Sequence, residues 1–231
     1  MSEYKGIKGF QVQTRTEDPA PFAQALADNP YAGAWSSGGN LNTARNFLSG
    51  SGAGTLTSSI AFGGASPSPT NALTENYNGT SWTNNPNGLN TARRGSGGCG
   101  TNTAALCAGG YATDFTAVVE EYNGTSWSEV NNLPLKRNAF RLVGTQTAAL
   151  GFGGYLPGPQ GGPGNLPTNS IIYDGTTWST NPSLATGSQR GGQAGTTTSA
   201  FTTAGQLGSG TTTENFDGVI ETVTAKTLTT S

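Results

Sequence analysis

Histidine is absent from this chain of 231 residues. Its absence removes the commonest general base and metal ligand of proteins, and no Ser-His-Asp triad can form without it. Only 10% of the residues are charged, and the net charge is −2. A phosphate-binding surface needs clustered Lys and Arg, so we expect no nucleic-acid partner. No catalytic set or cofactor motif is recognisable, so we expect a non-enzymatic protein without cofactor or metal.

Long apolar runs are also missing, and cysteines are few. No run approaches the roughly 20 residues of a membrane-spanning helix, so we expect no membrane insertion. Cys99 and Cys107 lack C-x-x-C spacing, and Cys107 aligns in the repeats described below with Ala61 and Gly151. We therefore expect two small buried thiols rather than a disulfide. A hairpin turn at "GTNT" would place Cys99 opposite Ala104.

Glycine (36 residues), proline (12 residues), threonine, serine and asparagine are abundant instead. This mixture favours short strands joined by tight turns, and it disfavours long helices. Composition therefore indicates an all-β fold.

One phrase occurs three times: "TENYNGTSW", "VEEYNGTSW" and "SIIYDGTTW". The four tryptophans lie 47, 45 and 51 residues apart, and each is followed by a leucine after six or seven residues. Three repeats then carry an arginine, and all four carry a pair of small residues and an aromatic residue before Asn-Gly or Asp-Gly. We expect the repeated aromatic residues to pack within or between the repeats: Trp35, Trp82, Trp127, Trp178, Tyr77, Tyr122, Tyr173 and Phe216.

Each repeat contains strand-sized segments between turn signals. In the second repeat these are "GSGGCG", "AALCAG", "TAVVEEY" and "TSWSEV". "NG" predicts a two-residue hairpin in which both residues take positive φ. The double glycine predicts a close approach of another backbone. Four strands in a period of about 45–50 residues are the content of one propeller blade, so we expect about four blades of four strands.

Arginine, an apolar strand, Gly-Gly, Glu-x-Tyr and Trp in this order resemble the kelch repeat. The pattern reads "AR…SIAFGG…TENYNGTSW" in the first copy, and the resemblance covers about residues 35–218. It implies an all-β, kelch-like β-propeller. The third copy has Ile171 in place of the glutamate, and the fourth has Ala204-Gly205 and no final tryptophan.

Repeats this uniform also resemble the kelch-like repeats in virion structural proteins of marine phages. The opening "MSEYKGIKGFQVQT" resembles the start of such proteins, some of them from cyanophages. This resemblance implies a virion protein that decorates the capsid or belongs to the tail. Its partners would be other virion proteins and copies of itself.

Two sets of charged residues recur at fixed repeat positions. We expect structural hydrogen bonds from both, with a cation site in the propeller channel as the alternative for the glutamates and ligand binding as the alternative for the arginines. These residues are Glu75, Glu120 and Glu214, and Arg45, Arg93 and Arg137.

The chain divides by pattern into an N-terminal arm (1–34), the propeller (35–218) and a C-terminal strand or tail (219–231). A strand is expected over 4–14 and a short helix over 19–30. We expect the arm to attach the protein to a partner, with packing under its own propeller as the alternative. Its apolar candidates for that contact are Tyr4, Ile7, Phe10 and Phe22.

Two other segments carry open alternatives. We expect 34–41, with Trp35, to supply the outer strand of the fourth blade beside Phe201 and Phe216. The competitor for this place is 219–229, which is rich in Thr and Val. The Pro- and Gly-rich insertion 155–169 is expected to be a surface loop, with a partner-contacting loop as the alternative.

The sequence thus predicts a non-enzymatic virion structural protein held by its arm, with the propeller exposed. The alternative is a carbohydrate- or receptor-binding module of a phage tail fibre, whose partner is a host-surface glycan. Some kelch-like propellers are copper oxidases, but the usual histidine ligands are missing from this chain.

Overall fold

The computed structural model describes residues 36–66, 68–157, 166–203 and 212–218. The chain divides into two compact units, residues 1–37 and 38–231, and all described strands belong to the second. No helix occurs among the described residues, which confirms the all-β prediction. The predicted strand 4–14 and helix 19–30 lie outside the described residues.

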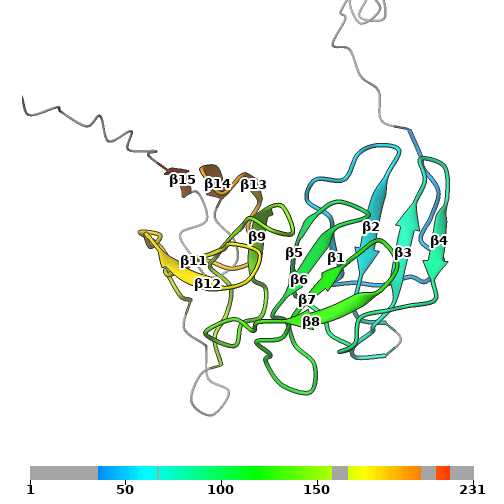
Figure 1. The fold of residues 1–231 in the computed structure, drawn as a ribbon, viewed down its shortest axis with the longest axis horizontal. Coiled ribbons are helices and arrows are strands. Elements are labelled where there is room, and N and C mark those ends of the chain that lie inside the picture. Colours follow the sequence, from blue (N-terminus) through cyan, green and yellow to red (C-terminus); the bar gives the residue numbers. More distant parts are fainter. Residues whose placement is uncertain (1–35, 67, 158–165, 204–211, 219–231) are drawn as a thin grey trace, which may run out of the picture. The chain divides into compact units, whose positions relative to one another are not determined.

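The strands form four antiparallel sheets, here called sheets I to IV (Figure 1). Each sheet is a meander in which consecutive strands are neighbours, and together they make a propeller-like β fold. Sheet I contains β1 (Ser49–Gly50), β2 (Ser59–Phe62), β3 (Thr74–Tyr77) and β4 (Trp82–Asn85); sheet II contains β5 (Gly97–Gly100), β6 (Ala105–Ala108), β7 (Val119–Tyr122) and β8 (Trp127–Val130); sheet III contains β9 (Arg141–Gly144), β10 (Ala149–Phe152), β11 (Ser170–Tyr173) and β12 (Trp178–Asn181); sheet IV contains β13 (Gln193–Gly195), β14 (Ser199–Thr203) and β15 (Thr213–Asp217).

Sheets I to III have the predicted four strands, and each segment predicted as a strand in the second repeat contains one of β5 to β8. Sheet IV has three strands in the described part of the chain, and its last strand is β15. Of the segment expected to complete it, residues 36–41 form no strand, and Trp35 lies outside the described residues. The competing segment 219–229 also lies outside them.

The turns differ from the expectation in two details. In the hairpin between β7 and β8, only Gly124 has a positive φ, of 91°, so Asn-Gly does not place both residues there. Asn123 instead accepts hydrogen bonds at Oδ1 from the backbone N–H groups of Thr125 and Ser126, both at 2.9 Å. Glycine as the first central residue is typical of a type II′ turn.

The turn between β5 and β6 also shifts the predicted register. Thr101 N–H bonds Ala104 O at 2.9 Å, and Cys99 pairs with Leu106, not with Ala104. The expected pairing was wrong by two residues because the turn is centred on 102–103.

The hydrophobic core lies between the sheets. Phe62 of sheet I packs with Ala105 and Trp127 of sheet II, and Phe152 of sheet III packs with Ala200 of sheet IV. The first strands β1, β5, β9 and β13 lie side by side in that order. Sheets that follow one another in the chain therefore bury apolar side chains against each other, as expected of repeat units that do not fold alone.

The double glycine carries one of these contacts between sheets. Gly109 has a φ of 64°, and a Cβ there would lie 2.7 Å from the carbonyl oxygen of Arg137 in the next repeat. The N–H of Gly110 donates to that same oxygen at 2.6 Å. Gly63 and Gly64 make the equivalent approach to Arg93 O. The predicted close backbone approach is confirmed, and it joins neighbouring repeats.

Candidate functional site

The repeated arginine and glutamate form buried ion pairs within sheets I and II. Arg45 Nη2 lies 2.6 Å from Glu75 Oε1, and Arg93 Nη1 lies 2.5 Å from Glu120 Oε1. The glutamates also accept hydrogen bonds from the chain entering the sheet. Glu120 Oε2 accepts from the backbone N–H of Asn90 at 2.6 Å, and Glu75 Oε2 accepts from that of Asn42 at 2.7 Å. The predicted structural role of these residues is confirmed, and their charges are neutralised inside each sheet.

Repeat 3 lacks the glutamate and also the N–H group that it would bind. Ile171 stands at the glutamate position, and Pro134 stands where repeat 2 has Asn90. Arg137 is left without a carboxylate, and its Nη1 donates to the carbonyl oxygens of Gly153 (3.2 Å) and Asn169 (3.3 Å). Burial lowers the pKa of Arg137 to about 10.

Repeat 4 keeps the glutamate and lacks the arginine. Glu214 accepts from the backbone N–H groups of Ala185 and Thr186, but Ser188 stands at the arginine position. The guanidinium comes from Arg141 in β9 of the preceding repeat, which donates to Ser188 O at 2.8 Å and Thr203 O at 3.3 Å. A neighbouring repeat thus fills the place of the missing side chain.

These carboxylates do not gather into a metal site. In the part of the chain that the structure describes, no group of three or more His, Cys, Asp or Glu residues is placed to hold a metal ion. The cation-site alternative for the glutamates therefore gains no support.

Four equivalent residues line the loops that lead into the first strands of the four sheets. We call Phe47, Gly95, Ala139 and Arg190 the ring residues; their φ angles are 51°, 61°, 51° and 57°. Gly95 N–H donates to Phe47 O at 2.9 Å, and Ala139 N–H donates to Gly95 O at 2.7 Å. The Arg190 guanidinium lies 5.4 Å from the centre of the Phe47 ring, so the loops that lead into β13 and β1 are in contact.

The ring residues border a cavity of about 310 Å³ lined by all four repeats, including Arg94, Asn138 and Gln193. A second cavity, of about 450 Å³, is lined by β1, β5, β9, β13 and the loops beside them. Sequence reasoning missed the ring residues, because only Gly95 is of a type that favours positive φ.

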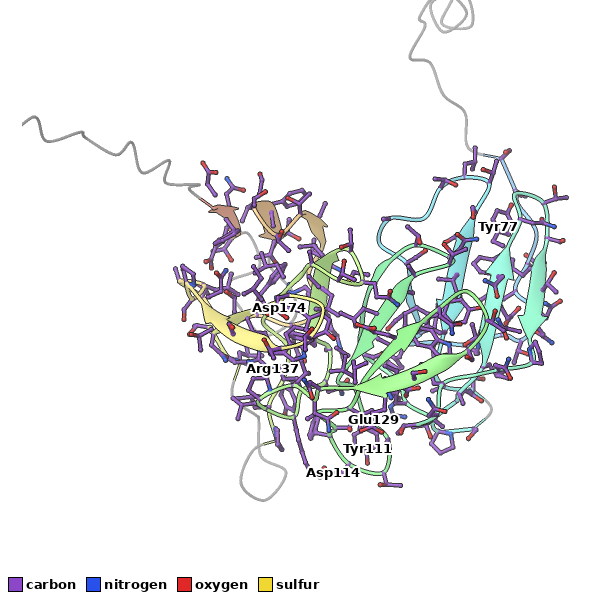
Figure 2. All side chains as sticks on the ribbon, viewed as in Figure 1. Tyr77, Tyr111, Asp114, Glu129, Arg137 and Asp174 are labelled. Carbon is purple, nitrogen blue, oxygen red and sulfur yellow. The ribbon has the colours of Figure 1, made fainter. Side chains whose placement is uncertain are left out.

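An aromatic cluster lies on the loops that follow the double glycines. Phe115 contacts Tyr111 and Tyr155, with ring centres 5.8 and 5.6 Å apart, and Arg94 lies 4.9 Å above the Tyr111 ring. Tyr111 and Asp114 lie on the loop between β6 and β7 (Figure 2). Sequence reasoning missed this cluster, although Gly-Gly-Tyr in repeats 2 and 3 is a signal that could have predicted it.

The repeated tryptophans differ in burial. Trp127 is 4% exposed, lies 4.8 Å from the Phe62 ring, and donates from Nε1 to Thr74 Oγ1 at 3.0 Å. Trp82 and Trp178 are half-buried, and each packs against the tyrosine of its own hairpin, so the expected packing within or between repeats is confirmed for all three, with Trp127 the most deeply buried.

Their tyrosine partners stack beside them within each hairpin. The Tyr122–Trp127 and Tyr173–Trp178 ring centres are 5.1 and 4.7 Å apart. Both tyrosines are buried. Tyr77 and Phe216 are half-buried.

Cys99 and Cys107 are buried and free, as predicted. Burial raises the pKa of Cys99 to about 12 and also raises that of Cys107.

The arm candidates Tyr4, Ile7, Phe10 and Phe22 lie outside the described residues, as does 158–165 of the insertion. No helix among the described residues is long and apolar enough to cross a membrane. No family model matches the chain, and no curated protein is significantly similar to it.

Proposed function

We propose that this chain is a non-enzymatic structural protein of a phage particle. Residues 1–34 attach it to the capsid surface or the tail apparatus, and the propeller is exposed. The observation that carries the proposal is that the recurring arginine and glutamate side chains form their hydrogen bonds inside the protein. The Arg45–Glu75 and Arg93–Glu120 pairs are buried within their own repeats, so these recurring charged side chains support the frame of each repeat rather than a binding surface.

The proposal includes a closed, kelch-like propeller of four blades. Its support is the set of ring residues at equivalent positions, two of which bond the preceding repeat through the backbone. The contact between Arg190 and Phe47, on the loops before β13 and β1, supports an arrangement with the fourth sheet beside the first. Closure removes exposed sheet edges, which suits a module displayed on an outer surface.

The arm provides the attachment by burying Tyr4, Ile7, Phe10 and Phe22 in a partner and by pairing its backbone with a strand edge there. Deletion of residues 1–30 tests this, because it leaves Trp35 and all described strands intact. The truncated protein should give an all-β circular dichroism spectrum and a cooperative melt, yet be missing from assembled particles.

The matched control is the full chain with Thr83→Ala, an exposed position on β4, which should be incorporated normally. Residues 1–34 fused to an unrelated soluble domain should carry that domain onto particles. Normal incorporation of the truncated protein would refute attachment by the arm and would show that the propeller makes the contact with the particle.

The second candidate function is binding of a host-surface glycan. The aromatic cluster of Tyr111, Phe115 and Tyr155 favours it, because partly exposed rings beside polar groups are suited to stack on sugars. A glycan array would decide: specific binding lost in Tyr111→Ala but kept in Thr83→Ala would favour this function over the structural one.

A further inference from the structure

The charged residues that line the cavity of about 310 Å³ beside the ring residues all have the same sign. They are Arg94, Arg141 and Arg190, and the described lining contains no Asp or Glu. Arg94 precedes β5, Arg141 begins β9 and Arg190 precedes β13, so the fold brings together arginines that the sequence separates. A hollow lined by charges of one sign attracts counter-ions, because its protein walls screen those charges less than water does.

Two of these arginines lack the carboxylate that the buried arginines of sheets I and II possess. Among the described residues, neither Arg94 nor Arg141 forms an ion pair with an Asp or Glu. Arg94 Nη1 donates to the carbonyl oxygen of Pro69 at 3.1 Å, and its guanidinium lies over the Tyr111 ring. An anion in the cavity would therefore supply a negative charge that the described residues do not place there.

The Arg141 guanidinium lies directly behind the cavity wall. Arg141 is 3% exposed, and a Cβ at Gly191, which lines the cavity, would collide with Arg141 Nη1. The two Nη groups donate to Ser188 O and Thr203 O, but Nε is buried without a hydrogen-bond partner. A buried guanidinium attracts an anion more strongly than an exposed one, because the surrounding protein has a lower dielectric constant than water.

The cavity can be entered from solvent at the ring residues. Phe47 and Arg190 line it and are both exposed, so solvent reaches this end of the cavity. The side chains of Asn138 and Gln193 also line it, and their amide groups carry N–H donors. An anion can therefore meet charged and uncharged donors without a rearrangement of the sheets.

The size and donors of the cavity define the class of ligand. Its volume of about 310 Å³ lies at the lower end of the roughly 300–1,000 Å³ of ligand pockets, so the ligand is small. Guanidinium groups bind oxyanions through paired N–H donors, and their planar shape matches two oxygens at a time. Arginines from three successive repeats suit a tetrahedral ion, because its oxygens point in several directions.

We propose that this cavity binds a small tetrahedral oxyanion of the sulfate or phosphate type, free or as an ester, through Arg94, Arg141 and Arg190. The bound ion links the loops or strand ends of three repeats and so stabilises their arrangement. The inference does not depend on the virion role. It also agrees with the expected absence of a nucleic-acid partner, because a chain of many phosphates needs an extended basic surface rather than one cavity.

Equilibrium dialysis of the full chain with radiolabelled sulfate or phosphate tests the proposal, in excess sodium chloride at constant ionic strength. The main variant is Arg190→Gln, because this side chain is exposed and its replacement should leave the fold intact. Arg94→Gln is the second variant. The matched control is Lys136→Gln, which removes the same charge at an exposed position; Lys136 pairs with Asp114 and does not line the cavity.

We expect saturable binding of one ion per chain that chloride does not displace. Arg190→Gln and Arg94→Gln should each weaken it about tenfold or more, as expected for loss of a hydrogen bond to a charged group, while Lys136→Gln keeps the native affinity. Circular dichroism melts in chloride show that each variant is folded. Displacement by glucose 6-sulfate but not by glucose identifies an ester as a ligand, and its failure identifies the free ion. No saturable binding by the native chain, or an equal loss in all three variants, would overturn the proposal.

Discussion

The variant Glu120→Ile places in repeat 2 the isoleucine that repeat 3 has at the equivalent position, Ile171. Glu120 is fully buried, and its carboxylate pairs with Arg93 and accepts from the N–H groups of Asn90 and Thr91. Isoleucine would leave a buried guanidinium without its counter-ion and two N–H groups without an acceptor. Breaking a buried ion pair from one side costs about 3–5 kcal/mol, a large part of the roughly 5–15 kcal/mol that stabilises a domain.

Repeat 3 avoids part of this loss, because Pro134 has no N–H group and Arg137 donates to two carbonyl oxygens. The assay is urea unfolding followed by circular dichroism. The control is Glu129→Ile on β8, which pairs with Glu120 in register but is exposed and should change stability by less than about 0.5 kcal/mol. A loss below about 1 kcal/mol for Glu120→Ile would refute the claim that the pair and its amide bonds hold the sheet together.

Three further outcomes follow from packing, backbone and burial. Trp127→Ala should destabilise by about 3–5 kcal/mol, and Trp82→Ala should destabilise by less, because the Trp82 side chain is only half-buried. Equal melting temperatures for the two variants would contradict this. Ala139→Gly should stabilise by about 1 kcal/mol in urea unfolding, because the residue has a φ of 51°; a destabilised variant would show that the Ala139 methyl group matters more than backbone strain. Cys99 and Cys107 should react with a thiol reagent at pH 8 only after unfolding, and reaction of the folded protein would contradict their burial. Because burial raises their pKa in the folded state, the stability linked to the protonated thiols is complete below about pH 8.5 and declines as the pH rises toward the Cys99 pKa of about 12.

The parts of the fold that depend on local sequence were predictable. The strands of repeat 2, the missing outer strand of sheet IV in the described part of the chain and the burial of both cysteines all follow from apolar runs, turn residues and alignment of the repeats. The turn centred on 102–103 was misread by two residues, because Thr-Asn-Thr has no glycine to mark its centre.

Features that depend on another repeat were not predictable. Ser188 stands where other repeats have an arginine, and Arg141 of the adjacent sheet III takes over its hydrogen bonds. The spacing of residues within one repeat does not predict this substitution. The positive φ of Phe47, Ala139 and Arg190 arises where four loops meet, because the assembled repeats rather than the residue types impose it. The lesser burial of Trp82 is a further example, because Trp127 is covered by Phe62 of the preceding sheet and the repeated sequence around the two tryptophans is nearly the same.

The central claim is that the chain is an exposed, non-enzymatic component of a phage particle. Gold-labelled antibody raised against the truncated protein that lacks residues 1–30 tests it most directly on intact, purified particles. We expect label on the outside of the capsid or on the tail of most particles, and loss of that label from particles assembled with the truncated protein. Particles that carry no label, in preparations that contain the free protein, would contradict the account.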